Sequence, residues 1–370
     1  MLNIMHGDQA CYGSLVGLVQ RSFAVGQGNW GSPGLIDSKA ASMRYSEVKA
    51  NKFLTDGFTE FLDYVKWEEL ELDSEPLNLP FYIPIGLIGE GLIQGIGLHT
   101  CKIPRYKFPD LIKRLISLIE NHEIKPVLIP NLGENQVFED SLGTYEKICL
   151  TGEGVLQCVP KIQVAKNGIH ILSKNPINSL SQLQSFNNEY EEKNCQPYYD
   201  IVDLSKKTLN VFVSPKKGAL TQAFIKEIVT IISCRIHVKV HIVSSTGNVE
   251  LLGIDALLLN SYIKWRMAYL AKLNHDLAKL NQKLLELNII LEIRKILETN
   301  PTVKSISDIV KLNTSKYTSK DIEDVCSKYR IKTLIEAHID IPAVIAEINT
   351  VSNDIANINN IALARIKALV

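Results

Sequence analysis

The sequence predicts an α+β protein built from several domains. The chain has 370 residues, more than one compact domain usually contains. Helix-like and strand-like segments alternate between residues 108 and 255, which predicts a mixed α/β region. The remainder is helical, with leucines at alternating three- and four-residue steps, as in a coiled coil. We therefore expect three domains, covering residues 1–66, 67–255 and 256–370.

The composition restricts the functional class only weakly. The 40 basic and 40 acidic residues give a net charge of zero, which argues against a uniformly basic nucleic-acid-binding domain but allows a local basic groove. The seven cysteines show no Cys-x-x-Cys spacing. We therefore expect reduced thiols in a cytoplasmic protein, without a zinc site or a disulfide framework. No apolar run approaches the ~20 residues of a membrane span, so no membrane partner is expected.

The stretch from Gly26 to Lys49 carries the clearest chemical pattern. Three glycines in six residues allow the backbone to turn sharply or to approach a bulky group. Residues Asp37–Ser42 predict a capped helical turn, which would present Arg44 and Tyr45 side by side. A tyrosine hydroxyl, with a pKa of about 10, needs help to attack phosphorus, and a neighbouring guanidinium stabilises phosphate oxygens. Alone, such a pair is more often an incidental part of a surface loop.

Two motifs in this stretch resemble the DNA-cleavage centre of type IIA DNA topoisomerases. They are Gly-Gln-Gly-Asn-Trp-Gly-Ser at residues 26–32 and Ala-Ala-Ser-Met-Arg-Tyr-Ser-Glu-Val at residues 40–48. The resemblance is to the breakage–reunion subunits, which are the A subunit of gyrase, the C subunit of topoisomerase IV and the medium subunit of the bacteriophage enzymes. It implies that Tyr45 is the nucleophile that bonds to DNA and that Arg44 stabilises the phosphate. The DNA-binding residues it implies in the same stretch are Gln27, Asn29 and Lys39.

The N-terminal block from His6 to Tyr12 resembles the start of the second half of the family's helix-turn-helix-like DNA-binding domain. Asp8 is a plausible N-cap for the helix that follows, and the resemblance implies that His6 donates to a phosphate near the break. The family has a second histidine where this chain has Ile4. It also has a preceding segment with a further catalytic arginine. We therefore expect a partial winged-helix domain, either truncated or completed by a separate N-terminal piece.

Beyond the tyrosine, apolar residues recur at helical spacing from Val48 to Val65 and predict an amphipathic helix. A glycine-punctuated apolar run from Pro80 to Gly97 then resembles the family segment whose isoleucine intercalates between base pairs and bends DNA. The resemblance assigns this wedge to Ile96, with Leu92 as the alternative. A buried strand is the less favoured interpretation of the run. A small basic cluster suited to backbone phosphates follows, formed by Lys102, Arg105 and Lys107.

The mixed region contains several recognisable elements. We expect a helix at Leu111–Ile119 and strands at Ile162–Ile171, Val211–Val213 and Ile236–Val243. In the last strand, His237 and His241 share the polar face, which is more typical of a solvated sheet than of a metal site. The motif Thr-Gly-Glu-Gly at residues 151–154 resembles a motif of the family's tower domain, with Glu153 in place of arginine. The resemblance therefore implies an α/β tower.

The C-terminal region predicts a long antiparallel coiled coil. A continuous helix from Ala256 to Glu298 would be roughly 65 Å long. The apolar seam of this helix consists of Leu270, Leu273, Leu277, Leu280, Leu284, Leu287 and Leu291. The seam of a returning helix consists of Ile341, Val344, Ile348, Val351, Ile355 and Ile358. A small helical knot lies between them, with a short apolar helix near Ile331–Ile339. The resemblance implies that this knot forms a homodimer contact.

Taken together, the resemblance implies a type II DNA topoisomerase subunit that cleaves and rejoins double-stranded DNA through a 5′-phosphotyrosyl intermediate. ATP-dependent strand passage, as relaxation or decatenation, would require partner Toprim and ATPase subunits. We recognise no Glu…Asp-x-Asp cluster and no Gly-rich ATP site in the sequence, so Mg²⁺ and ATP are expected to bind those partners. The expected location is the cytoplasm, on the nucleoid, or the host cytoplasm if the protein is viral. The alternatives are a non-catalytic dimeric DNA-binding scaffold and a purely structural coiled-coil protein.

Overall fold

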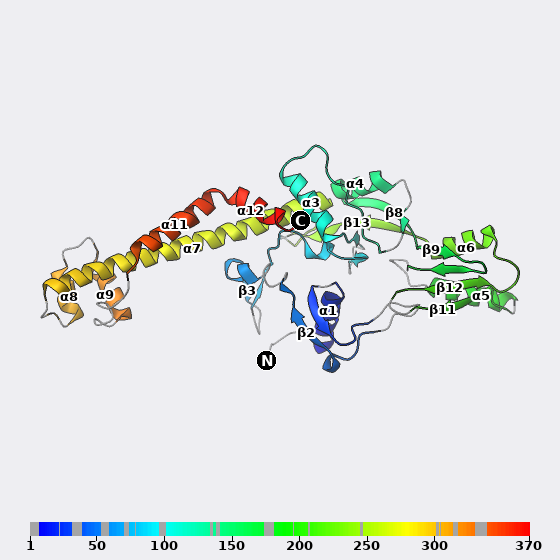
Figure 1. Ribbon diagram of the computed structural model, residues 1–370, viewed down its shortest axis with the longest axis horizontal. Helices are drawn as coiled ribbons and strands as arrows, with labels where there is room; N and C mark the ends of the chain where they lie inside the picture. Colours follow the sequence, from blue (N-terminus) through cyan, green and yellow to red (C-terminus); the bar gives the residue numbers. More distant parts are fainter. Residues whose placement is uncertain are drawn as a thin grey trace. The chain divides into compact units, whose positions relative to one another are not determined.

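The protein is described here from a computed structural model, shown in Figure 1. The residues it describes are 7–21, 23–31, 39–52, 59–69, 74–77, 79–95, 101–133, 136–137, 141–173, 181–194, 196–205, 208–244, 247–300, 303, 305–313, 317–329 and 339–370. The chain forms two compact units, Met1–Trp265 with Leu363–Val370, and Arg266–Ala362. Among the helices in these ranges, none combines the length and the apolar character needed to cross a bilayer.

The N-terminal part of the first unit consists of one helix and a two-stranded sheet. Helix α1 (Asp8–Gln20) precedes strand β1 (Ala24–Gln27), which pairs antiparallel with β2 (Glu47–Ala50). The short 3₁₀ turn η1 (Met43–Tyr45) leads directly into β2. The expected helix is confirmed, but the expected Asp8 cap is wrong, because Gly7 is the N-cap, no side chain caps the helix, and Asp8 is its first residue. The assignment of this region to a winged-helix domain stays a prediction.

The prediction of an amphipathic helix from Val48 to Val65 is wrong over the residues that the structure describes. Val48 lies in β2, opposite Gly26, and Thr59–Tyr64 form the 3₁₀ helix η2. Residues 53–58 lie outside the described ranges. Phe61 is buried, with its ring edge-on to Trp265 at 6.4 Å, so a contact between residues 204 positions apart replaces the local helical pattern. The acidic segment that follows contains the antiparallel strands β3 (Trp67–Glu69) and β4 (Ser74–Pro76).

A five-stranded sheet with the order β5-β6-β13-β8-β7 occupies the centre of the first unit. Its strands are β5 (Leu92–Gln94), β6 (Lys102–Pro104), β7 (Gln136–Val137), β8 (Glu153–Val159) and β13 (Cys234–Lys239). Helices α3 (Phe108–Ile119) and α4 (Ser141–Thr151) accompany it, and α3 confirms the expected helix at Leu111–Ile119. The sequence alternation puts Ile236, Val238, Val240 and Ile242 on one apolar face. The first three are fully buried, whereas Ile242 is half-buried and lies beyond the end of this sheet.

The strand expected at Ile236–Val243 ends early. Val240 leaves the sheet by donating its amide to Gly152 O at 2.9 Å, and β14 (His241–Val243) then pairs with β15 (Val249–Leu251) in a separate ribbon. Gly152 follows α4 with a positive φ of 79°, and a Cβ there would stand 2.3 Å from Leu252 O. This glycine of the Thr-Gly-Glu-Gly motif therefore permits close approach of three chain segments.

A second, four-stranded sheet has the order β11-β12-β10-β9. Its elements are β9 (Ile162–Val164), β10 (Ile169–Ile171), α5 (Ser181–Asn194), β11 (Tyr199–Asp203), β12 (Val211–Pro215) and α6 (Gln222–Ile232). Both helices pack their apolar residues into the core that the strands supply. The single strand expected at Ile162–Ile171 is wrong, because β9 and β10 form an antiparallel pair. The turn contains Asn167-Gly168, a hairpin signal in the sequence.

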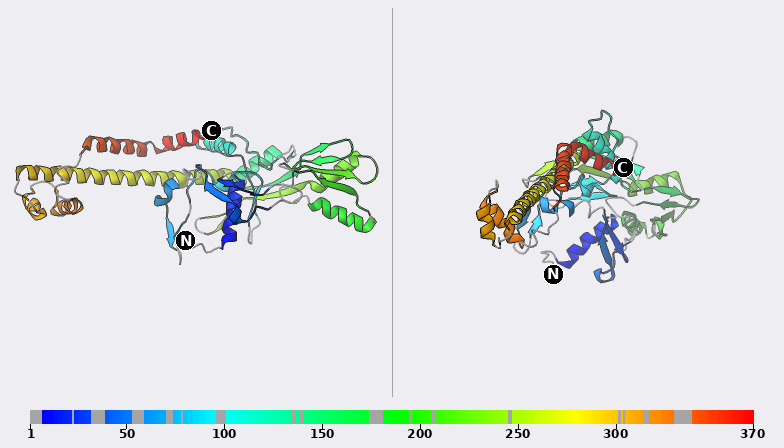
Figure 2. Two further views of the ribbon diagram at one scale, coloured as in Figure 1. Left: turned by 60° about the horizontal axis from the view of Figure 1, so that its bottom comes forward. Right: turned by 60° about the vertical axis from the view of Figure 1, so that its left-hand side comes forward.

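The second unit is a helical hairpin. Helix α7 (Ile254–Thr299) begins in the first unit and contains the expected helix from Ala256 to Glu298. Two helices then run back along it, α11 (Ile341–Ala356) and α12 (Ile358–Lys367), as Figures 1 and 2 show. The expected continuous return helix is therefore interrupted, at Asn357. Arg266 Nη1 on α7 donates to Asn359 Oδ1 on α12 at 2.5 Å.

The expected seam positions of the hairpin are its less exposed ones. On α11, Val344 is buried and Ile348 and Val351 are half-buried, while most side chains around them are exposed. The knot consists of α8 (Ile306–Leu312) and α9 (Ser319–Lys328), which pack on the end of α7 around a shared apolar core. The expected apolar helix at 331–339 lies, up to residue 338, outside the described ranges. The coiled coil itself stays a prediction.

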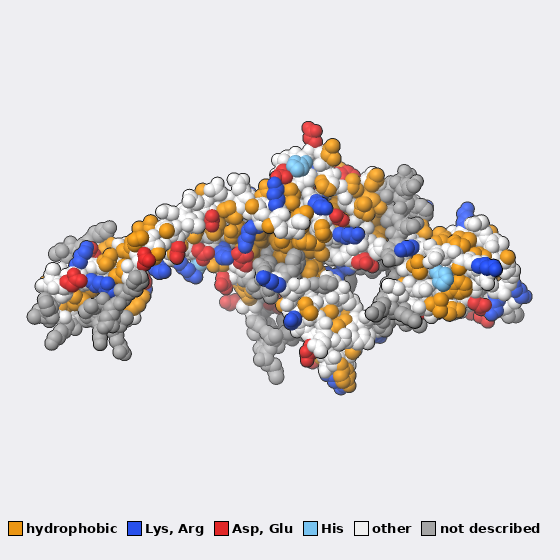
Figure 3. Space-filling view, in the orientation of Figure 1, with side chains coloured by type: hydrophobic (Ala, Val, Ile, Leu, Met, Phe, Trp, Pro, Cys, Tyr) orange, Lys and Arg blue, Asp and Glu red, His pale blue; other side chains and the backbone are white. Residues whose placement is uncertain are grey.

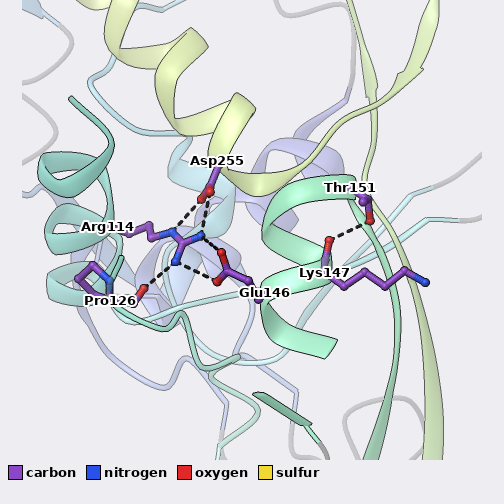
Figure 4. A network of polar contacts seen from close by, with 6 residues as sticks. All are labelled: Arg114, Pro126, Glu146, Lys147, Thr151 and Asp255. Carbon is purple, nitrogen blue, oxygen red and sulfur yellow. Dashed lines mark hydrogen bonds and ion pairs between the residues drawn. The ribbon is translucent and has the colours of Figure 1, made fainter. Parts of the chain in front are cut away.

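A fully buried arginine joins four segments of the first unit (Figure 4). Arg114 on α3 donates Nε and Nη2 to the two carboxylate oxygens of Asp255, at 2.9 and 2.8 Å. It donates Nη1 and Nη2 to Glu146 on α4, at 3.1 and 2.8 Å, and Nη1 also reaches Pro126 O at 2.9 Å. All five N–H groups of the guanidinium are thereby used. Burial opposes the charge, but these hydrogen bonds outweigh it and raise the pKa of Arg114 above its ordinary value.

Candidate functional site

Tyr45 ends the 3₁₀ turn η1 and is 66% exposed. The turn is closed by Tyr45 N donating to Ser42 O at 2.9 Å and Ser46 N donating to Met43 O at 3.2 Å. It stops after three residues because Ser46 is already extended and the chain enters β2. The helical turn expected at Asp37–Ser42 lies outside the described ranges up to residue 38, and the remaining residues are not helical. The tyrosine is thus presented on a short turn between an irregular segment and a strand.

Arg44 and Tyr45 interact directly. The Cζ atom of the Arg44 guanidinium lies 4.9 Å from the centroid of the Tyr45 ring. Such a cation–π contact at an exposed site stabilises by about 0.5–1 kcal/mol and holds the positive charge beside the phenol. Both side chains are exposed, so an incoming ligand could reach a nucleophilic oxygen and a fixed cation together.

The glycine-rich motif forms a platform for this turn. Gly28 has a φ of 107°, and a Cβ added to it would stand 2.9 Å from Tyr45 O. A Cβ on Gly26 would lie 2.4 Å from Nε1 of Trp30. Asn29 O accepts a hydrogen bond from Ala41 N at 2.9 Å, which ties the motif to the segment before the turn. Contacts between the two motifs therefore hold the turn against the glycine-rich segment.

Tyr12 on α1 also fixes the turn, although the sequence pattern assigns it no role. Its hydroxyl donates to Ala41 O at 2.6 Å and lies 3.1 Å from Ser46 Oγ. Because a phenol has one proton, Ser46 is the donor in the second bond. The Tyr12 ring packs at 5.8 Å from the Trp30 ring. Tyr12 thus holds both ends of the turn, and its position in the N-terminal block was the only signal that could have indicated this.

Two of the other residues expected near the tyrosine, Gln27 and Asn29, belong to the glycine-rich motif. Gln27 is an exposed residue of β1, paired with Glu47. The Asn29 side-chain oxygen accepts from Gly31 N at 3.0 Å, and Lys39 is exposed before the turn. Their DNA contacts stay predictions. His6 lies outside the described residues.

The expected basic cluster does not present three equivalent cations. Arg105 is half-buried and donates Nε to Gly86 O at 3.3 Å and Nη1 to Glu90 O at 3.2 Å. Lys102 is a half-buried strand residue opposite Lys239, whereas Lys107 is exposed before α3. Tertiary structure separates these residues because β6 ends between them.

Of the two wedge candidates, the structure describes only Leu92. Leu92 is half-buried in β5, opposite Pro104. Ile96, the preferred wedge, lies outside the described ranges. Intercalation therefore stays a prediction.

His237 and His241 do not share one sheet face. His237 is exposed on β13, and His241 belongs to β14 in the separate ribbon. Over the described ranges, no group of three or more His, Cys, Asp or Glu side chains is placed to hold a metal ion.

Comparison with known proteins identifies the family of this chain. The family described as the A subunit of DNA gyrase/topoisomerase IV matches residues 3–369. The chain is similar to the DNA gyrase A subunit of Helicobacter pylori strain J99, with 26% identity over 239 residues. That match covers 59% of this chain and 28% of the relative, so the chain spans about a quarter of that protein's length. Because the family match covers nearly the whole sequence, this chain belongs to the family of DNA gyrase and topoisomerase IV A subunits.

Proposed function

We propose that this chain is the DNA-cleavage subunit of a type II DNA topoisomerase, with Tyr45 as the nucleophile. The observation that carries the proposal is the exposed phenol on a fixed turn, with the Arg44 guanidinium over its ring. The fixed turn lowers the entropic cost of positioning the phenol, and Arg44 provides positive charge where phosphate charge accumulates.

The reaction is a reversible transesterification. The Tyr45 oxygen attacks a backbone phosphorus and forms a 5′-phosphotyrosyl ester, while the bond from phosphorus to the 3′ oxygen breaks. The phenol loses its proton and the departing 3′ oxygen gains one. One phosphodiester is exchanged for another, so resealing needs no external energy source. Gln27, Asn29, Lys39 and His6 would contact the flanking phosphates.

Mg²⁺ and ATP would be bound by companion Toprim and ATPase subunits. The ion would supply stabilisation of charge on the phosphate. This chain's own residues hold the nucleophile and orient the DNA, and the complex would act on the nucleoid in the cytoplasm.

We further propose that two copies act together, one on each DNA strand. The hairpin of the second unit carries exposed apolar side chains, among them Leu285, Leu312 and Ile345 at 37, 41 and 43% exposure. Figure 3 shows hydrophobic and charged side chains interspersed along this arm. A twofold contact through the knot would bury such residues and would place two tyrosines on one duplex.

The test is the covalent adduct. The assembled enzyme, with companion subunits, labelled DNA and Mg²⁺, is denatured, and the labelled peptide is mapped. We expect label at residue 45, none in Tyr45→Phe, and normal labelling in Tyr190→Phe, a matched change on α5. An adduct that persists in Tyr45→Phe would refute the proposal. Salt-dependent DNA binding by the wild type without any adduct would instead support the non-catalytic scaffold.

A further inference from the structure

Two arginines from distant parts of the first unit lie against the same glycine. Arg21 follows α1 and Arg105 follows β6, 84 positions later. A Cβ on Gly89 would stand 3.4 Å from Cδ of Arg105 and 3.7 Å from Cδ of Arg21. Gly89 has a φ of 125°, so it is suited both to this backbone and to this close approach.

Each guanidinium is fixed by the protein on one side only. Arg21 donates Nε to Gly17 O at 2.9 Å, and its Cζ lies 5.3 Å from the centroid of the buried Phe23 ring. Arg105 donates Nε and Nη1 to the backbone carbonyls of Gly86 and Glu90. Within the described ranges, both Nη groups of Arg21 and the Nη2 group of Arg105 have no protein acceptor.

The pair carries two positive charges in a half-buried place. Burial lowers the pKa of Arg21, and burial together with the charge of Arg21 lowers the pKa of Arg105. No ion pair among the described residues includes either side chain, in contrast to Arg114 with its two carboxylates. Two adjacent, fixed guanidinium groups without a counter-ion repel each other, and a bound anion would remove that cost.

We propose that Arg21 and Arg105 together bind one backbone phosphate of the DNA. The planar fork of each guanidinium matches phosphate oxygens. The pair is also related to the cleavage turn by a single helix. Tyr12, which holds the turn, precedes Arg21 by nine residues, on the order of 14 Å along α1. DNA that reaches Tyr45 would therefore pass close to the pair. This inference rests on the DNA binding proposed above.

The salt dependence of DNA affinity tests the proposal on the assembled enzyme. The logarithm of the DNA-binding constant falls linearly with the logarithm of the salt concentration, and each phosphate contact contributes about 0.9 to the magnitude of this negative slope. We expect Arg21→Gln and Arg105→Gln each to reduce the magnitude of the slope by about 0.9. The double variant should reduce it no further, because one phosphate is shared. Arg21→Lys should retain most of the slope. Lys226→Gln, an equal charge change at an exposed residue of α6, should leave it unchanged. Unchanged slopes in the arginine variants, or a doubled loss in the double variant, would overturn the shared site.

Inorganic phosphate provides a readout that does not involve DNA. Phosphate should raise the thermal midpoint of the wild type relative to chloride at equal ionic strength, and should not do so in the double variant. Equal stabilisation of both would overturn the proposal. Adduct formation at Tyr45 distinguishes a failure of the shared phosphate site from a failure of the proposed cleavage activity. Normal adducts with unchanged slopes would reject only the shared site of Arg21 and Arg105. Absence of adducts in the wild type would reject the proposed activity.

Discussion

The turn that presents Tyr45 and the junction around Arg114 use the same kind of side chain in opposite ways. At the junction, Arg114 is fully buried and all five of its N–H groups are bonded to protein oxygens. At the turn, Arg44 is exposed and its described contact is the face of a tyrosine ring. A guanidinium whose N–H groups are all bonded to protein oxygens can only stabilise the fold, whereas one with unused N–H donors can bind a substrate.

The pair of Arg21 and Arg105 lies between these extremes. Each is half-buried and partly bonded to backbone carbonyls, yet neither is neutralised by a carboxylate within the described ranges. Burial and satisfaction are therefore separate properties. The comparison predicts that replacing Arg114, whose N–H groups are all bonded, lowers the free energy of unfolding. Replacing Arg44, Arg21 or Arg105, which have unused donors, should instead lower activity or DNA binding.

The largest effect on stability is expected for Arg114→Ala. This change leaves the Asp255 carboxylate, 11% exposed, without its partner, and deprives Glu146 of one as well. Breaking such a buried pair costs about 3–5 kcal/mol. Urea denaturation should show the loss, while Lys113→Ala, an exposed neighbour on α3, should change stability by less than about 0.5 kcal/mol. A loss below about 1 kcal/mol for Arg114→Ala would show that the junction is not a structural anchor.

Arg44→Ala should produce the converse result. Removing a charge that stabilises the transition state is expected to slow adduct formation by about 10²–10³-fold. The thermal midpoint should fall only slightly, because the exposed side chain contributes about 0.5–1 kcal/mol through its contact with the Tyr45 ring. Single-turnover cleavage with the assembled enzyme measures the rate. If Arg44→Ala cleaved at the wild-type rate, the contrast between the two arginines would fail.

Tyr12→Phe is expected to have a smaller effect. The ring still packs on Trp30, but the hydroxyl no longer holds Ala41 and Ser46. We expect cleavage to slow by about tenfold, equivalent to ~1.4 kcal/mol, with DNA affinity unchanged. Ser46→Ala removes one of the two bonds and should slow the reaction less. An effect on affinity alone would argue against a positioning role.

A separate expected effect concerns the pH dependence of stability. Burial raises the pKa of the Cys149 thiol from 9.0 to about 12. The unfolded chain loses this proton at lower pH than the folded protein, so the stabilisation is complete below about pH 9 and disappears as the pH approaches 12. The difference in unfolding free energy between wild type and Cys149→Ala should narrow from pH 8 to pH 11. A constant difference would contradict this assignment.

Local patterns in the sequence predicted several elements correctly. The leucine repeat indicated α7, and an apolar run at helical spacing indicated α3. The same reasoning failed from Val48 to Val65, where pairing with β1 and the burial of Phe61 against Trp265 determine the conformation. The prediction of a single strand at Ile162–Ile171 failed for a different reason, because the turn signal Asn167-Gly168 lies within that range of the sequence itself.

The order of residues along the chain establishes which chemistry is available to this protein: an arginine next to a tyrosine, and a glycine-rich motif at the spacing of a known family. Which side chains remain available for a ligand depends on contacts between distant parts of the chain. Asp255 meets Arg114 across 141 positions, and Arg21 meets Arg105 across 84. Periodicity and motif spacing describe neighbours along the chain, whereas hydrogen bonding and desolvation depend on neighbours in space.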